Sequence, residues 1–188
     1  MTKKILVRIF ISFTSLLLIS FSRSDVIYKV SEGSITFISE APLETVSATS
    51  EKLSGLLDTT TREFAFSVLN TSFQGFNSVL QREHFNESYM ESDKFPRSTF
   101  SGKIIEVVSF RKPGVYTVRA KGLLNVHGVE QERIIKCELT IDNVSIKVTA
   151  NFDVTITDHE ISIPKIVFDK ISPEIKVVVK ATLLQKQE

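Results

Sequence analysis

One stretch of the sequence, VSIKVTANFDVTIT at residues 144–157, decides the class of fold. Apolar residues occupy every second position from Val144 to Ile156, and polar residues fill the positions between them. Successive side chains of a β-strand point to opposite faces, whereas a helix would place apolar residues three or four positions apart. The stretch therefore predicts a long strand with one apolar and one polar face, which is typical of an antiparallel sheet that faces water on one side.

The same alternation predicts strands over much of the remaining chain. The clearest segments are 63–69, 115–126, 129–141 and 174–184. His127-Gly128 lies between two of these segments and predicts a tight hairpin turn.

Shorter or less regular segments complete the expected set of strands. Residues 26–30 and 34–39 predict a first hairpin around Ser31-Glu32-Gly33, and 99–110 and 160–163 are expected to be extended. Residues 51–57 fit either a short strand or a helical turn.

The number of strands and the shortness of the turns favour one closed sheet. An open sheet of this size would leave two hydrogen-bonding edges exposed, and closure removes them. We therefore expect an all-β fold, an antiparallel up-and-down β-barrel of about eight strands. The interior of such a barrel is either filled by side chains or large enough for one small ligand.

The N-terminus has the pattern of a secretory signal peptide. Three basic residues precede the uncharged run 9–21, and small residues follow at Ser22 and Ser24. The uncharged run is short for a transmembrane helix, which needs ~20 residues. We expect residues 1–24 to be removed and residues 25–188 to form the mature domain, in the periplasm or outside the cell. The mature chain carries 19 basic and 22 acidic residues, a formal net charge of −3.

Composition narrows the classes of function. Neither the net charge of +1 for the whole chain nor that of −3 for the mature chain supports nucleic-acid binding. The 14 phenylalanines, without any tryptophan, supply large apolar surface that carries no polar group. Cys137, the only cysteine, excludes an internal disulfide, and its phase with Ile135 and Leu139 predicts an inert thiol on an apolar face.

Residues 70–98 interrupt the strand pattern and carry a family resemblance. So long an interruption in a compact domain is usually functional or contains a helix of its own, and parts of 78–92 fit a helix. The residues Gln81–Glu87, Tyr89–Ser92, Lys94–Pro96 and Thr99–Gly102 resemble the corresponding run of the YceI-like family of exported proteins. Weaker matches at 33–37, 122–128 and 168–181 occur in the same order as in the family, whereas 41–57 and 73–76 depart from its pattern.

This resemblance implies a lipocalin-like barrel without enzymatic activity, some of whose relatives bind polyisoprenoids or other long apolar chains. The apolar strand faces and the aromatic residues of the interrupted segment would surround such a ligand, an isoprenoid or fatty lipid. The candidate ligand-binding residues are Phe64, Phe66, Phe73, Phe76, His84, Phe85, Tyr89, Met90, Phe95, Tyr116, Val118, Leu139 and Phe152.

No motif proposes a reaction, a cofactor or a metal. His84, His127 and His159 lack the spacing of metal ligands, and the acidic residues of 83–93 are typical of a solvated face. Two rival hypotheses are a barrel with a filled core that serves as an interaction module, and a transmembrane barrel with its apolar face outward. Peripheral contact with a membrane is compatible with the sequence, which also leaves the oligomeric state open, with a dimer as one option.

Overall fold

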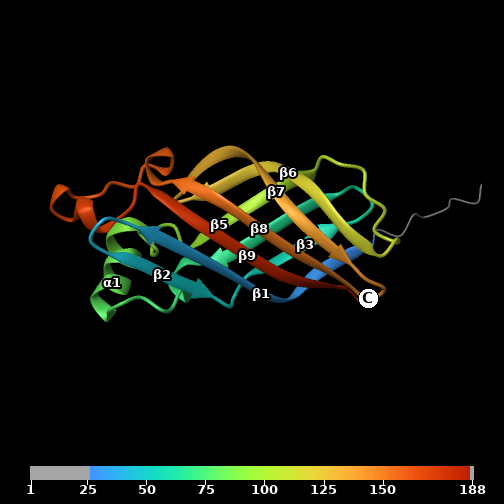
Figure 1. Cartoon of the computed structure of the whole chain (residues 1–188), viewed down its shortest axis with the longest axis horizontal. Helices are drawn as coiled ribbons and strands as arrows, with labels where there is room; N and C mark the ends of the chain where they lie inside the picture. Colours follow the sequence, from blue (N-terminus) through green and yellow to red (C-terminus); the bar gives the residue numbers. More distant parts are fainter. Residues whose placement is uncertain (1–25, 187–188) are drawn as a thin grey trace, which may run out of the picture.

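Antiparallel strands make up most of the molecule (Figure 1). The computed structural model describes residues 26–186. In chain order the elements are β1 (Ile27–Glu40), β2 (Thr45–Ser50), β3 (Ser54–Asp58), β4 (Glu63–Leu69), η1 (Asn70–Ser72), α1 (Val79–His84), η2 (Phe85–Tyr89), β5 (Arg97–Ile104), β6 (Gly114–Val126), β7 (Val129–Ile141), β8 (Ser145–Thr155), η3 (Ile156–His159), η4 (Lys165–Lys170) and β9 (Glu174–Gln185).

The strands close into a barrel by pairing the two ends of the chain. From β3 to β9 each strand pairs antiparallel with the next one in sequence. The last strand, β9, pairs with β1 from Tyr28↔Gln185 to Ile38↔Lys176, and the start of β1 pairs with β3. The predicted all-β, antiparallel, up-and-down barrel of about eight strands is confirmed, with β2 as an additional strand beside the end of β1.

The expected first hairpin is wrong, because residues 27–40 form the single strand β1. Ser31-Glu32-Gly33 provides a β-bulge, where the register against β9 shifts between Val30 and Glu32. A bulge adds a residue and increases the local twist without ending the strand. The pairing with β9 on both sides of the bulge keeps the segment extended, and this partner lies at the far end of the sequence.

Two further predicted strands, β8 and β5, have other ends in the structure, and a third predicted strand is absent from it. The strand β8 begins at Ser145 and not at Val144, because the Asp142 carboxylate accepts hydrogen bonds from the backbone amides of Ser145 and Val144, at 2.6 and 2.8 Å. It ends at Thr155 and not at Thr157, because Ile156 and Thr157 belong to η3. The strand β5 ends at Ile104, so that 105–110 is not extended as one strand. Residues 160–163 form no strand, since Glu160, directly after η3, has the left-handed conformation and the chain turns away. Residues 51–57 proved to include a strand, β3, rather than a helical turn.

The hairpin between β6 and β7 is as the sequence predicts. Val126 pairs with Val129, and the two residues between them have positive φ, 53° at His127 and 76° at Gly128. Positive φ at both central residues is the pattern of a type I′ turn, whose twist matches that of the flanking strands.

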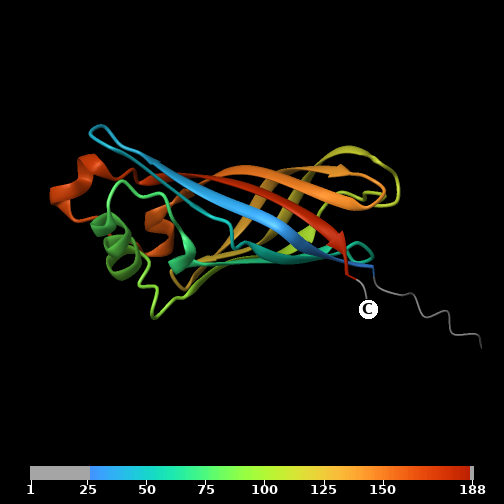
Figure 2. The ribbon, with the colours of Figure 1, turned by 90° about the horizontal axis from the view of Figure 1, so that it is seen from below.

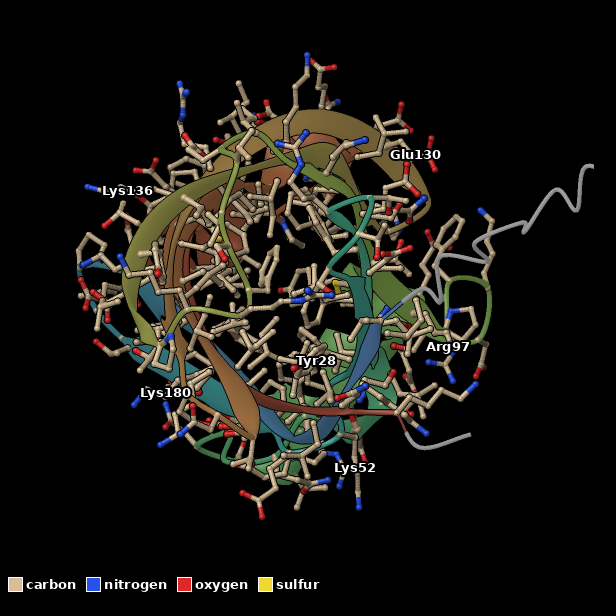
Figure 3. All side chains as sticks on the ribbon, turned by 90° about the vertical axis from the view of Figure 1, so that its right-hand side faces the viewer. Tyr28, Lys52, Arg97, Glu130, Lys136 and Lys180 are labelled. Carbon is tan, nitrogen blue, oxygen red and sulfur yellow. The ribbon has the colours of Figure 1, made fainter. Side chains whose placement is uncertain are left out.

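Apolar side chains point into the barrel and charged side chains point out. On β6, Val118, Ala120 and Leu124 are buried, whereas the intervening Arg119 and Lys121 are exposed. Figure 3 looks along the barrel and shows Lys136 and Lys180 projecting from its outer surface. The interior, where a ligand would bind, is therefore apolar.

Residues 1–24, the predicted signal peptide, lie outside the described residues. In the part of the chain from 26 to 186, no helix has the length and apolar character needed to cross a bilayer. The segment 78–92 does contain the expected helix, as α1 followed by the π-helical turn η2.

Candidate ligand-binding cavity

One end of the barrel is closed by its own side chains. Ile146 and Leu183 are fully buried there, and Tyr116 and Phe110 pack against the same cluster. The hydroxyl of Tyr116 donates a hydrogen bond to the backbone oxygen of Lys112, 3.0 Å away, in the turn that precedes β6. None of these four side chains lines either of the two chambers described next.

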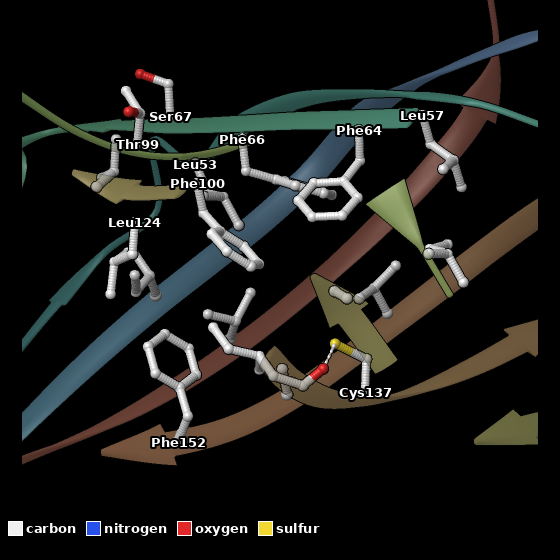
Figure 4. A pocket seen from close by; sticks show the side chains of 18 of the residues that line it. Leu53, Leu57, Phe64, Phe66, Ser67, Thr99, Phe100, Leu124, Cys137 and Phe152 are labelled. Atoms are coloured by element: carbon white, nitrogen blue, oxygen red, sulfur yellow. Dashed lines mark hydrogen bonds between the residues drawn. The ribbon is translucent and has the colours of Figure 1, made fainter. Parts of the chain in front are cut away.

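An inner chamber of about 110 Å³ lies above the closed end. Figure 4 shows its side chains converging from opposite walls of the barrel. They are mostly apolar and include Leu53, Leu57, Phe64, Phe66, Phe100, Ile104, Val118, Leu124, Cys137, Leu139, Val148, Ala150, Phe152 and Val179. Alternation along the strands explains this composition, because every second residue of each strand faces the interior.

A larger mouth chamber of about 430 Å³ occupies the other end. The two chambers share the lining residues Ile35, Val68, Ser98, Leu124 and Phe152. One chamber therefore begins where the other ends. Cavities of roughly 300–1,000 Å³ are typical of small-molecule sites, and the mouth chamber lies in this range.

Four phenylalanines form part of the wall of the mouth chamber and pack on one another. Phe37 of β1 stacks on Phe85 at 5.1 Å between ring centroids, with an angle of 13° between the planes. Phe73 and Phe76 contact both of these rings, at 5.2–5.8 Å. Aromatic pairs at such distances are favourable beyond their burial, so this cluster holds the segment 73–85 against β1.

The long segment between β4 and β5 is tied together where it leaves and rejoins the barrel. Asn70 is buried, its Nδ2 donates to the Phe95 backbone oxygen at 2.7 Å, and its Oδ1 accepts from Ser98 Oγ at 2.9 Å. Its backbone amide donates to the Pro96 oxygen at 2.9 Å. Hydrogen bonds of Asn70 therefore hold the two ends of this long segment together.

Two further contacts fix the segment across the mouth. On one side, Gln81 Nε2 and Asn77 Nδ2 donate to the Glu44 carboxylate, at 2.6 and 3.1 Å. On the other side, His127 Nε2 lies 2.7 Å from Glu91 Oε2. The polar groups of Glu44, Gln81 and Asn70 are thus paired within the protein, and the chamber they border does not need a polar ligand to satisfy them.

Burial shifts the pKa of three titratable groups near the chambers. Burial raises the pKa of the Cys137 thiol to about 11 and raises the pKa of the Tyr89 hydroxyl. Burial lowers the pKa of His159, which is fully enclosed and whose Nδ1 lies 3.0 Å from the Val129 oxygen. Each shift favours the neutral form, as expected in apolar surroundings. Among the described residues, no group of three or more His, Cys, Asp or Glu side chains is arranged to hold a metal ion.

The structure places eleven of the thirteen predicted residues on the two chambers. Phe64, Phe66, Val118 and Leu139 line the inner chamber, and Phe152 lines both. The mouth chamber is bordered by Phe73, Phe76, His84, Phe85, Tyr89 and Met90. Their part in ligand binding stays a prediction.

Phe95 and Tyr116 line neither chamber. Tyr116 has the phase of an inward residue but lies at the closed end, below the inner chamber. Phe95 packs from outside on the β6–β7 turn, against the ring of His127 at 4.8 Å between centroids. A Cβ atom at Gly128 would lie 2.3 Å from the Phe95 ring, so this contact requires glycine.

Several lining residues were not predicted. Ile35 and Phe37 alternate along β1, and Phe100 follows the same pattern on β5, so periodicity alone could have found them. Ile161 and Ile163 alternate within 160–163, whereas Val167 lies in η4, where no alternation indicates which side chains face the chamber.

Comparisons with known proteins place this geometry in context. The family model of the YceI-like domain matches residues 27–183. The fold is similar to that of a polyisoprenoid-binding domain from Saccharophagus degradans implicated in plant cell wall breakdown (TM-score 0.71, 13% identity, 86% of this chain and 99% of that one). It is also similar to BcnA of Burkholderia cenocepacia (0.63, 10%, 82% and 96%) and to a YceI protein of Campylobacter jejuni (0.58, 16%, 76% and 86%). A comparison with curated proteins finds no match.

Proposed function

Because the chain belongs to the YceI-like family, we propose that it is a non-enzymatic carrier that holds a long-chain apolar ligand, an isoprenoid or another lipid, inside its barrel. The observation that carries this proposal is the pair of adjoining apolar chambers. The alternative of an interaction module requires an interior without such space.

The dimensions of the chambers favour a chain-like ligand. If a methylene group takes about the volume of a water molecule in the liquid, ~30 Å³, the mouth chamber takes roughly 14 such groups and the inner chamber roughly four. Burying roughly 400 Å² of such a chain at ~25 cal/mol per Å² gains about 10 kcal/mol before ordering costs. This gain is of the same order as the cost of association, ~4–15 kcal/mol, so apolar burial supplies the main favourable contribution to binding.

The orientation of the ligand follows from the position of the polar side chains. His84 and Lys170 border the mouth chamber, whereas the inner chamber is bordered by apolar groups and a few hydroxyls. The polar end of the ligand stays at the mouth, and its chain extends toward Cys137. The name of the Saccharophagus domain supports an isoprenoid as the class of ligand.

Two features support a carrier over an enzyme and an exported protein over a cytoplasmic one. Burial keeps the Cys137 thiol protonated, so it is a poor nucleophile.

The pattern of residues 1–24 favours export to the periplasm or outside the cell. The N-terminal sequence of the protein recovered from its cell envelope tests this part: a start at Asp25 supports export, and an intact Met1 contradicts it.

Native mass spectrometry of the protein purified from its own envelope tests the carrier function. We expect a bound lipid that is lost after extraction with organic solvent and replaced by geranylgeraniol when the protein is reloaded. A protein that carries no lipid after purification and takes up none on reloading would contradict the proposal.

A further inference from the structure

Five large apolar side chains lie in solvent around the open end of the barrel. They are Leu43 (71% exposed), Val79 (76%), Leu80 (57%), Ile166 (91%) and Phe168 (58%), and together we call them the mouth rim. They belong to the β1–β2 turn, α1 and η4, which lie at the same end of the molecule in both perpendicular views (Figures 1 and 2). Neither α1 nor η4 has a buried residue.

Hydrogen bonds join the three segments of the mouth rim. The backbone amide of Leu43 donates to the Asp169 oxygen at 2.9 Å, which connects the β1–β2 turn to η4. Gln81 Nε2 donates to Glu44 at 2.6 Å, which connects the same turn to α1. The three segments that carry the exposed side chains are therefore held together at this end of the barrel.

This surface surrounds the entrance of the mouth chamber. Leu80, Val167 and Lys170 line the chamber, whereas their sequence neighbours Val79 and Phe168 are exposed. The same short elements thus supply the wall of the chamber and the apolar groups outside it. A partner that covers this surface would meet the chamber opening directly.

The charges beside the mouth rim suit lipid headgroups. Lys165 and Lys170 stand at the two ends of η4, on either side of Ile166 and Phe168, and Asp169 is the acidic residue between Phe168 and Lys170. The nearby Glu44 carboxylate already accepts hydrogen bonds from Asn77 and Gln81. Exposed apolar side chains flanked by lysines are the combination found on proteins that lie on anionic membrane surfaces.

We propose that the mouth rim docks on the surface of a phospholipid membrane. Ile166, Phe168 and Leu43 enter the boundary between headgroups and acyl chains, and Lys165 and Lys170 lie at the level of the phosphates. The purpose of this docking rests on the proposed function, because a docked mouth lets an apolar ligand pass between bilayer and chamber without crossing water.

Flotation with phosphatidylglycerol–phosphatidylethanolamine vesicles tests the docking. The chain from Asp25 onward is used, because it contains every strand of the barrel. We expect the double variant Ile166→Glu/Phe168→Glu to bind at least tenfold more weakly than the wild type. The control is Val107→Glu, since Val107 is 89% exposed and lies in the β5–β6 connection at the opposite end of the barrel (Figure 1). Unchanged unfolding midpoints show that all variants are folded.

The outcomes separate docking from ligand binding. Docking is overturned if the wild type does not float with the vesicles, if the double variant binds like the wild type, or if Val107→Glu weakens binding equally. Uptake of geranylgeraniol from detergent is measured on the same proteins. Normal uptake by the double variant with lost flotation supports both proposals, whereas absent uptake by the wild type overturns the proposed function alone.

Discussion

Filling the inner chamber is expected to change which chain lengths the barrel accepts. Ala150 lies on β8 and faces this chamber, between the paired residues Cys137 and Val179, which line it too. The substitution Ala150→Leu adds about three carbon groups to a space that holds roughly four. Because side chains of the protein do not fill this chamber, the added side chain does not have to displace packed neighbours.

The size of the effect follows from the apolar contact that the ligand loses. A chain displaced by about three methylene groups loses ~0.8 kcal/mol for each, about 2.4 kcal/mol in all, or roughly 60-fold in Kd. This loss applies only to ligands that are long enough to reach the inner chamber. Geranylgeraniol exceeds the capacity of the mouth chamber and should bind roughly 60-fold more weakly, whereas the shorter geraniol should be unaffected.

Isothermal titration of both alcohols into wild type and variant measures this difference. The matched control is Ala65→Leu, the same substitution at an exposed position on the outer face of β4. Equal loss for the two alcohols, no loss for geranylgeraniol, or the same loss in the control would refute the placement of the chain in the inner chamber.

Three further predictions concern the same interior. Urea unfolding should show that Ile146→Ala, in the packed closed end, lowers the free energy of unfolding more than Leu139→Ala, beside the inner chamber. Both losses should lie within about 2–5 kcal/mol, and the opposite order would contradict the assignment of packed and open regions. With its pKa raised to about 11, Cys137 should react with a disulfide reagent at pH 8 roughly 100-fold more slowly than an unfolded thiol, and equal rates would show that the chamber admits water. Because burial lowers the pKa of His159 in the folded state, the unfolded state binds this proton more tightly, and stability should fall as the pH drops below ~6.5. The free energy of unfolding of His159→Gln should fall less between pH 8 and pH 5 than that of the wild type. An equal fall in both proteins would exclude His159 as its source.

The strands that the sequence predicts well are those whose alternation is long and whose turns are local. The strand β7 has the predicted bounds, 129–141, because His127-Gly128 and Asp142 fix the turns at its two ends. The strand β1 was mistaken for a hairpin because its partner β9 lies at the other end of the chain. A local pattern cannot distinguish a bulge within a paired strand from a turn between two strands.

The cavity could be predicted only in part for a similar reason. Periodicity gives the face on which a side chain lies, but not its height along the barrel axis. Tyr116 therefore looks equivalent to Val118 in sequence, although it lies at the closed end and Val118 lines the inner chamber. Phe95 belongs to an irregular segment, where its position depends on the long-range contact with Gly128.

The central claim is that one apolar chain occupies both chambers, and a crystal structure of the protein loaded with geranylgeraniol tests it most directly. We predict continuous electron density from the entrance near Lys170, past Phe152, to within contact of the Cys137 sulfur. Density confined to the outer surface, or a barrel in which Phe100 and Phe152 have closed the passage between the chambers, would contradict the account.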